Sequence, residues 1–321
     1  MPRPSSSTTI QRADLGALAY EYYMENDQFI GLDLLPVFEV GEKSSDYPVI
    51  PIEALMKMPK SLKRAPRGAY QRGDYEFETG TYTCEEYGWE EPIDEVEAAL
   101  YRRFFDAESV ATLRATKILL RDMEKRIADA VMNVSNITNT SAVTVEWSSA
   151  AGAKPKKDSD YAITTLYETT GVPVDTVAMS WKVFKNLMKT AEIKDYLQYT
   201  NPHMLSTREQ QKEMLARYFD VERVLIGGAQ YDSAGRGKAF SLSNIWSNEY
   251  VLFARVSDGG QDLKDPCLGR TFLWTEDSPE ILVTEQYREE QIRSDVYRVR
   301  HNVDEAFVFT GAGFLLSNIT A

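Results

Sequence analysis

The chain of 321 residues is 43% hydrophobic, which excludes a mainly disordered protein and suits one elaborated domain or two domains. Its net charge of −13 argues against a main binding face that neutralises phosphates, although a local basic patch is compatible with it. With only Cys84 and Cys267, a disulfide framework and a four-cysteine zinc site are excluded; we expect two buried or idle thiols, with a single disulfide between them as the alternative.

An amphipathic arm is predicted near the N-terminus. Apolar residues recur there with helical spacing at Leu15, Leu18, Ala19 and Tyr22. No second helix follows directly that would bury this face. Two interpretations stay open: the helix docks on its own domain, or it docks on a neighbouring subunit.

Residues 32–89 are predicted to be extended, because prolines and glycines punctuate them and short alternations at 47–52 and 75–78 are typical of strands. The charges in and after this segment are segregated. The run Lys57–Arg72 contains no acid, and the run Asp74–Glu97 contains no base. A long loop with few core-forming residues cannot easily bury itself, so it is either floppy or lies across another molecule.

We interpret the two charge blocks as a protein–protein contact, with nucleic-acid binding by the basic run beside Tyr70 as the alternative. The candidate interface residues are the bases and acids of these blocks: Lys57, Lys60, Lys63, Arg64, Arg67, Arg72, Glu85, Glu86, Glu90 and Glu91.

A long helix is predicted next, opening at Pro92-Ile93-Asp94 with acids in its first turn and running without Pro or Gly to about Asn133. The apolar stripe comprises Val96, Leu100, Phe104 and Ala107 in the first half, and Leu113, Leu120, Ile127 and Val134 in the second. We expect one helix packed on a sheet. A break around Phe105-Asp106 and a coiled coil are the alternatives.

An α/β pattern follows a polar stretch at 133–157. Helices are predicted over 162–170, 181–190, 192–199 and 208–219, and strands over 174–179, 223–227 and 250–256. The block from 281 to 321 is predicted to be β only, with strands over 281–283, 296–299, 306–310 and 313–316.

No motif in the sequence specifies a reaction. His203 and His301 lie in no metal-binding pattern, and Gly235–Lys238 lacks the first glycine and the Ser or Thr of a phosphate loop. Ser180 lacks the flanking glycines of a nucleophile elbow and is predicted to be a helix cap. The longest nearly apolar stretch, 306–316, is too short for a membrane span. We expect a soluble protein without catalytic residues, cofactor or metal; an α/β enzyme with a scattered site is the rival.

The order of these segments resembles the major capsid protein of tailed bacteriophages. The resemblance covers nearly the whole chain and includes local patterns: Glu90-Glu91-Pro92-Ile93-Asp94-Glu95 before the long helix, and Val174–Ser180 before Trp181–Leu187. The stretch Tyr218–Val224 with Asn244-Ile245-Trp246 downstream belongs to it too.

The resemblance implies an α+β fold with an N-terminal arm, an extended β-hairpin loop, a spine helix on a peripheral sheet and an inserted α/β axial domain. The implied boundaries are 1–29 for the arm, 30–92 for the loop, 93–149 with 278–321 for the peripheral domain, and 150–277 for the axial domain. The loop would then reach over an adjacent subunit.

The resemblance also implies a function. The chain would form pentamers and hexamers of an icosahedral shell around double-stranded DNA, which it would contact without sequence specificity. Scaffolding, portal and decoration proteins are the implied partners, with no membrane; the protein would be made in the host cytoplasm and end in the virion. An encapsulin-like compartment shell shares this fold, and its gene neighbours would distinguish it. An adaptor or decoration protein that binds a shell is a further rival.

Overall fold

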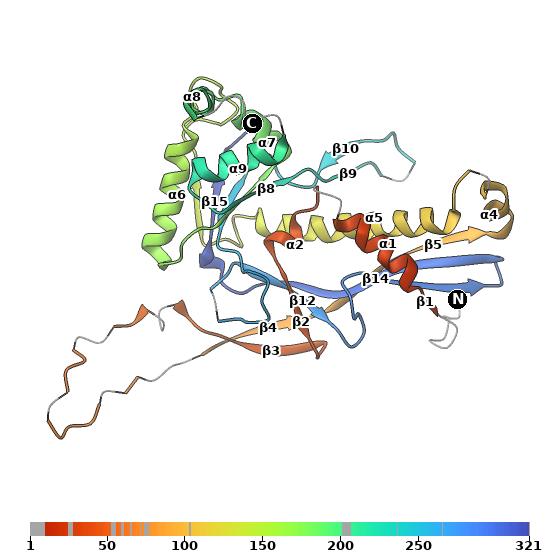
Figure 1. Cartoon of the computed structure of the whole chain (residues 1–321), viewed down its shortest axis with the longest axis horizontal. Helices are drawn as coiled ribbons and strands as arrows, with labels where there is room; N and C mark the ends of the chain where they lie inside the picture. The colour runs from red at the N-terminus through yellow and green to blue at the C-terminus, as the bar shows by residue number, and fades with distance from the viewer. Residues whose placement is uncertain are drawn as a thin grey trace.

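The computed structural model describes residues 10–24, 28–52, 56–58, 61–64, 66–70, 72–73, 77–102, 104–200, 207–235, 237–264 and 266–320. Within these ranges the chain forms two sheets, each covered by helices, and a hairpin that projects from the body (Figure 1).

The first sheet is built around one long strand, β14 (Ser294–Phe307). The strand order is β1 (Ile10–Gln11), β13 (Val283–Glu289), β14, β12 (Gly269–Trp274) and β2 (Val37–Val40). A further strand, β5 (Glu85–Asp94), also pairs with β14, antiparallel over residues 294–303. Because β14 is longer than any strand it pairs with, it forms ladders with three strands, β5, β12 and β13.

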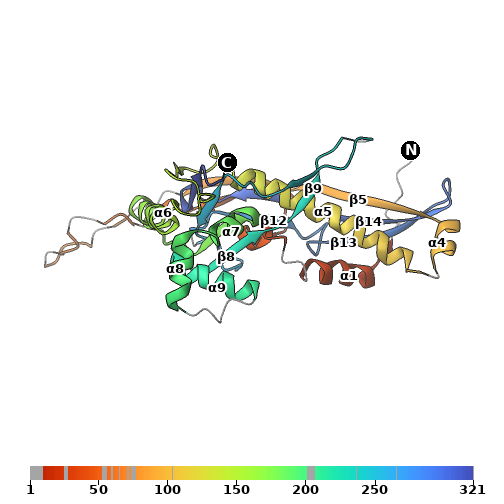
Figure 2. The same ribbon diagram turned by 90° about the horizontal axis from the view of Figure 1, so that it is seen from above.

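Helix α5 (Ala107–Val131) lies against β5 and β14 (Figure 2). One face of α5 is buried, and its buried residues include Leu120 and Ile127 from the predicted stripe. Packing on a sheet is therefore confirmed. The stripe is wrong at its end, since α5 stops at Val131 and Val134 is exposed.

The expectation of one helix from Pro92 to about Asn133 is wrong, because β5 continues to Asp94 and two helices follow it; the alternative, a break around Phe105-Asp106, is confirmed. A separate helix, α4 (Glu95–Tyr101), precedes α5, and Asp106 caps the start of α5 by accepting from the Ser109 amide. The predicted first half of the stripe is not buried within the chain, because Val96, Leu100 and Phe104 are 71%, 64% and 81% exposed.

The N-terminal arm docks on its own domain. Helix α1 (Ala13–Met24) packs against α5 and β13, with Leu15 and Ala19 buried. Just before it, the Arg12 amide donates to Thr284 O at 3.0 Å. Of the two interpretations of the arm, the structure shows docking of the helix on its own chain.

The predicted hairpin is formed by β3 (Ser44–Val49) and β4 (Glu78–Thr83), which pair antiparallel. An aromatic cluster fixes its base to the first sheet, where the Tyr82 ring stacks on Phe272 at 4.7 Å and Tyr47 lies 5.1 Å from Phe272. Residues 75 and 76 of the expected strand at 75–78 lie outside the described residues, and β4 begins at Glu78. The chain then runs directly from β4 into β5.

The second sheet has the order β6 (Asn139–Ala142), β15 (Gly313–Ser317), β11 (Val251–Ala254), β7 (Thr176–Ser180) and β8 (Arg223–Gly227). Helices α6 (Pro155–Thr170), α7 (Trp181–Leu187), α8 (Ala191–Thr200) and α9 (Arg208–Phe219) lie around it. Both β7 and β11 are wholly buried. Short elements complete the described chain: α2 (Gly31–Leu34) and the hairpin of β9 (Gln230–Asp232) and β10 (Leu242–Asn244).

Two smaller expectations are confirmed. Cys84 and Cys267 are free and buried. Ser180 caps α7, with its hydroxyl accepting from the Val183 amide at 3.3 Å.

The two sheets do not follow the domain boundaries that the resemblance implies. Strands β6 and β15 fall in the expected peripheral segments but pair in the second sheet, whereas β12 falls in the expected axial segment and pairs in the first. The turn η1 (Thr310–Ala312) passes the chain from β14 to β15, so the last block is shared between both sheets.

Candidate assembly surfaces

The basic loop at the end of the hairpin is the first candidate surface. Lys57, Lys63, Arg64, Arg67 and Arg72 are all exposed, whereas Lys60 lies outside the described residues. Within the described part of the chain, no ion pair involves any of these five bases. Large apolar side chains are exposed beside them: Met56, Met58, Leu62, Tyr70 and Phe77. Exposed apolar and basic groups in one loop indicate a surface that another molecule covers.

The loop has local order of its own. The Arg64 guanidinium lies over the Tyr70 ring at 4.8 Å, and its Nε donates to Gly68 O at 2.5 Å. Between them, Arg67 has a φ of 65°, which makes a tight turn. This turn brings Arg64 and Tyr70 together, and it leaves Lys63 with only a backbone contact to Ser61 Oγ at 3.2 Å.

The four acidic interface candidates all lie on β5, on alternating faces of the sheet. Glu91 faces α5, where Arg114 lies 3.6 Å from its carboxylate, and Glu85 accepts from the Tyr87 hydroxyl at 3.1 Å. Glu86 and Glu90 lie on the face that α5 does not cover. The acidic block is therefore divided between two faces of one strand.

Arginines of β14 meet the open face of β5. Arg298 lies 3.5 Å from Glu90 and donates through Nε to Glu285 at 2.8 Å. Arg300 pairs with Asp277 at 2.6 Å and with Glu285 at 3.0 Å. Burial opposes the charge on Glu285, but hydrogen bonds from Arg300 and Arg298 outweigh it and hold its pKa below the ordinary value.

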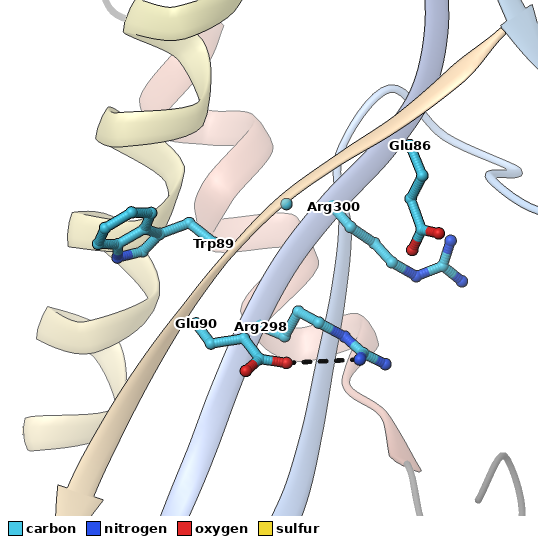
Figure 3. A pocket seen from close by; sticks show the side chains of 6 residues that line it. Glu86, Trp89, Glu90, Arg298 and Arg300 are labelled. Carbon is cyan, nitrogen blue, oxygen red and sulfur yellow. Dashed lines mark hydrogen bonds and ion pairs between the residues drawn. The ribbon is translucent and has the colours of Figure 1, made fainter. Parts of the chain in front are cut away.

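A hollow of about 420 Å³ lies between these side chains, lined by Glu86, Gly88, Trp89, Glu90, Arg298 and Arg300 (Figure 3). It exists because residue 88 has no side chain; a Cβ there would lie 3.1 Å from Arg300 Cβ. Both arginines are already paired with Glu285, whereas Glu86 is exposed and forms no ion pair with any described residue. The lining of the hollow thus combines two carboxylates, Glu86 and Glu90, with two guanidinium groups, Arg298 and Arg300.

The far end of the molecule carries an apolar surface. Val96, Leu100 and Phe104 are exposed on and after α4, and Ile292 is exposed in the turn beside it. Figure 1 shows α4 at the end opposite to the hairpin loop. An ion cluster supports this end, since Arg293 pairs with Glu95 at 2.9 Å and Arg288 pairs with the same carboxylate.

Glu124 is a buried carboxylate that joins three distant segments. It is 1% exposed, and its Oε1 accepts from the Ile30 amide at 2.8 Å and from Trp246 Nε1 at 2.6 Å. Its Oε2 accepts from the Gly31 amide at 2.8 Å. Trp246 in turn covers Gly227 of β8, where a Cβ would lie 2.1 Å from the indole. Glu124 therefore joins α5 both to the segment at Ile30-Gly31 and, through Trp246, to the second sheet.

Burial raises the pKa of Glu124 to about 7 and Asp33 adds to the rise, while the three N–H donors oppose it. The folded chain thus holds this proton more tightly than the unfolded chain. The stability from this difference is full below about pH 4.5 and is lost as pH rises to about 7. We expect wild type to lose about 3 kcal/mol more than Glu124→Gln between these limits. Urea unfolding of unassembled protein checks this, and parallel curves for both proteins would contradict it.

The described residues offer little that resembles a catalytic or metal-binding site. His301 is buried, and burial together with nearby Arg126 lowers its pKa to about 3, so the ring is neutral; His203 lies outside the described residues. Among the described residues, no group of three or more His, Cys, Asp or Glu side chains is placed to hold a metal ion. None of the described helices is long and apolar enough to cross a membrane.

Sequence reasoning missed three parts of these surfaces: Arg298 and Arg300 opposite β5, the hollow at Gly88, and the buried Glu124. The alternation Arg298-Val299-Arg300, which begins in the predicted strand 296–299 and continues one residue past it, was the available signal for the two arginines. Nothing in the sequence marks Glu124 as buried, because it lies among charged residues of α5.

Comparisons with known proteins bear on the fold. No protein-family model matches the sequence, and no curated protein matches it. The chain is similar to a phage-related protein from Bordetella bronchiseptica RB50, with a TM-score of 0.70 and 19% identity over 97% of this chain and 98% of that one. It is also similar to the putative capsid protein of a prophage of E. coli CFT073, with a TM-score of 0.56 and 11% identity over 96% and 99% of the two chains.

A third similar structure is the virus-like particle from Pyrococcus furiosus, with a TM-score of 0.55 and 10% identity over 95% and 97% of the two chains. At these identities the likeness establishes the fold. The chain is an α+β protein with the fold of phage capsid proteins, which confirms the fold class predicted from its sequence.

Proposed function

We propose that the chain is the major capsid protein of a tailed bacteriophage, which self-assembles into an icosahedral shell around double-stranded DNA. The observation that carries this proposal is the likeness over nearly the full length of both chains, at a TM-score of 0.70, to a phage-related protein. A fold alone does not specify function, so the surfaces of the molecule must also suit a shell.

The surfaces support the proposal because both ends of the elongated molecule expose groups that its own fold leaves uncovered. One end presents the basic loop, whose five described bases make no ion pair within the described chain, and the other presents the apolar surface of α4. In a shell each copy contacts several neighbours, and many weak contacts per copy add to a stable assembly.

The partners follow from the proposed role. The chain would bind other copies of itself in pentamers and hexamers, with scaffolding, portal and decoration proteins as further partners during assembly. Its net charge of −13 suits a lumen that holds DNA without binding it, since an acidic wall repels phosphates. The protein would be made in the host cytoplasm and reside in the virion, where it acts as a structural protein rather than an enzyme.

A cellular compartment shell is the second candidate. The resemblance seen in the sequence left this alternative open, and the fold is shared by a particle that is not described as a phage, the virus-like particle from Pyrococcus furiosus, at a TM-score of 0.55. Particles recovered from the natural source distinguish the two: encapsidated double-stranded DNA supports the phage shell, and an enclosed enzyme without DNA supports the compartment.

Purified protein at high concentration is expected to form closed shells of uniform diameter in negative-stain electron microscopy, alone or with a co-expressed scaffolding protein. Mass photometry of the same sample should show one dominant large species. A chain that stays monomeric under all these conditions would contradict the proposed function.

A further inference from the structure

Arg270 on β12 is a buried cation that forms no ion pair with any described residue. It is 1% exposed, and its Nη2 donates to Gly260 O and to Asp262 O, each at 3.0 Å. Neither Nε nor Nη1 has an acceptor in the described part of the chain. A buried charge is costly unless an opposite charge or a full set of hydrogen bonds compensates it, and this guanidinium has neither.

Other largely buried arginines of this fold do have that compensation. Arg126 pairs with Glu305 at 2.7 Å, and Arg300 pairs with Glu285 at 3.0 Å. Each of these two guanidinium groups therefore meets a carboxylate of its own chain. Arg270 departs from this pattern although it is more deeply buried than either of them.

Two carboxylates near Arg270 are engaged elsewhere. Asp262 is close enough for the charge of Arg270 to help lower its pKa, but its carboxylate binds Lys264 at 2.9 Å. Asp304 projects from the same face of the sheet as Arg270, by the register of β12 and β14, and accepts from the Thr83 amide at 2.8 Å. The charge of Arg270 is therefore available to an anion from outside the chain.

A thinly held loop covers this guanidinium. Residues 257–264, the connector, lead from β11 of the second sheet towards β12 of the first, and the residues in the middle of the connector are all exposed. Besides the two carbonyl contacts just described, the Gln261 side chain accepts from the Glu39 amide at 3.0 Å. Gly259 has a φ of 79° and open space around it. So few contacts allow the connector to lift without unfolding the sheets.

We propose that Arg270 anchors a binding site for a small oxyanion of the phosphate type, which enters when the connector lifts. Nη2 belongs to both donor edges of a guanidinium, Nε with Nη2 and Nη1 with Nη2, and each edge can bind two oxygens of an oxyanion. The connector carbonyls occupy Nη2 and so block both edges. Lifting the connector frees them, and the bound anion supplies the missing counter-charge. Phosphate compensates better than a carboxylate because it carries more charge.

Equilibrium dialysis of the full-length chain against radiolabelled inorganic phosphate, at constant ionic strength, tests the site. Wild type should bind one phosphate per chain above the weak background of its surface bases. Arg270→Met should weaken this binding on the order of tenfold or more, because it removes both donor edges. Arg217→Met, which removes an exposed arginine paired with Glu213, is the matched control and should bind as wild type does.

The Met variant should stay folded, because an apolar side chain of similar length replaces a charge that the described chain does not compensate. Circular dichroism checks this. Arg270→Lys is the second variant: it keeps the charge but has no edge that holds two oxygens. Its affinity for phosphate should fall between those of wild type and Arg270→Met.

Gln261→Ala tests the role of the connector. It removes the hydrogen bond to the Glu39 amide and so favours the lifted form. Because only the lifted form binds, the apparent affinity for phosphate should rise about fivefold. A residue that served only to hold the fold together would not change phosphate binding in this direction.

Three results would overturn the proposal: no phosphate bound by wild type, equal binding by wild type and Arg270→Met, or weaker binding by Gln261→Ala. Acetate that displaces phosphate at equal concentration would overturn the assignment to a phosphate-type anion. These measurements follow binding rather than assembly, so their failure leaves the proposed shell function standing.

Discussion

Replacing Lys63, Arg64 and Arg67 together with Glu is expected to abolish shell formation while the chain stays folded. All three side chains are exposed, and none pairs with an acid among the described residues. Their reversal therefore costs the isolated chain little, whereas in the proposed shell contact it places three negative charges against the acidic surface of a neighbouring copy. Electron microscopy and size-exclusion chromatography should show only small species, and circular dichroism should match wild type.

The charge-preserving variant Lys63→Arg, Arg64→Lys and Arg67→Lys is the matched control, and it should still assemble. It keeps a cation over the Tyr70 ring and retains every positive charge of the segment. Normal shells from the triple Glu variant would show that the loop is not an electrostatic contact. Loss of shells in both variants would assign the loop a role that depends on arginine geometry rather than on charge.

Glu124→Ala is expected to lower the free energy of unfolding by about 4 kcal/mol, because it leaves three buried N–H donors without an acceptor. It also opens a cavity between α5 and the segment at Ile30-Gly31. Urea unfolding should be measured in the triple Glu background, so that assembly does not contribute to the apparent stability. A loss below 1 kcal/mol would contradict the assigned role.

Glu124→Gln separates the hydrogen bonds from the charge. Its carbonyl oxygen still accepts from Ile30 and Trp246, but its NH₂ group meets the Gly31 amide, donor against donor. Below about pH 4.5, where Glu124 contributes fully, we expect a loss near 2 kcal/mol, smaller than for Ala because the amide keeps two of the three hydrogen bonds. Equal losses in the two variants would show that the acceptor for the Gly31 amide, which both variants lack, accounts for the whole effect.

The helical periodicity was sufficient to predict the spine of the molecule. Leu120 and Ile127 recur at seven-residue spacing and are buried on the sheet, and Asp106 marks the start of α5. The same periodicity failed at Val96, Leu100 and Phe104, because spacing shows that residues share a face but not whether anything covers it. At the end of the molecule that carries α4, no described residue covers these side chains.

The acidic residues of β5 show that a charge pattern in the sequence likewise does not reveal which charges are paired. Glu86 and Glu90 look alike in sequence, yet Glu90 lies against Arg298 and Glu86 forms no ion pair within the described chain. The pairing of β5 with β14 joins residues some two hundred positions apart, and local alternation carries no information on which strand is the partner.

The sequence by itself determined that this chain has a sizeable core, an amphipathic arm, a long spine helix, and a basic run beside an acidic one. These are local properties of spacing and composition, and the net charge of −13 matters less than its segregation. Only the tertiary structure decided that the arm stays on its own domain, that Glu124 joins three segments, and that Arg270 is buried without an ion pair among the described residues. Those features depend on contacts between residues far apart in the chain, which form only when the whole chain folds.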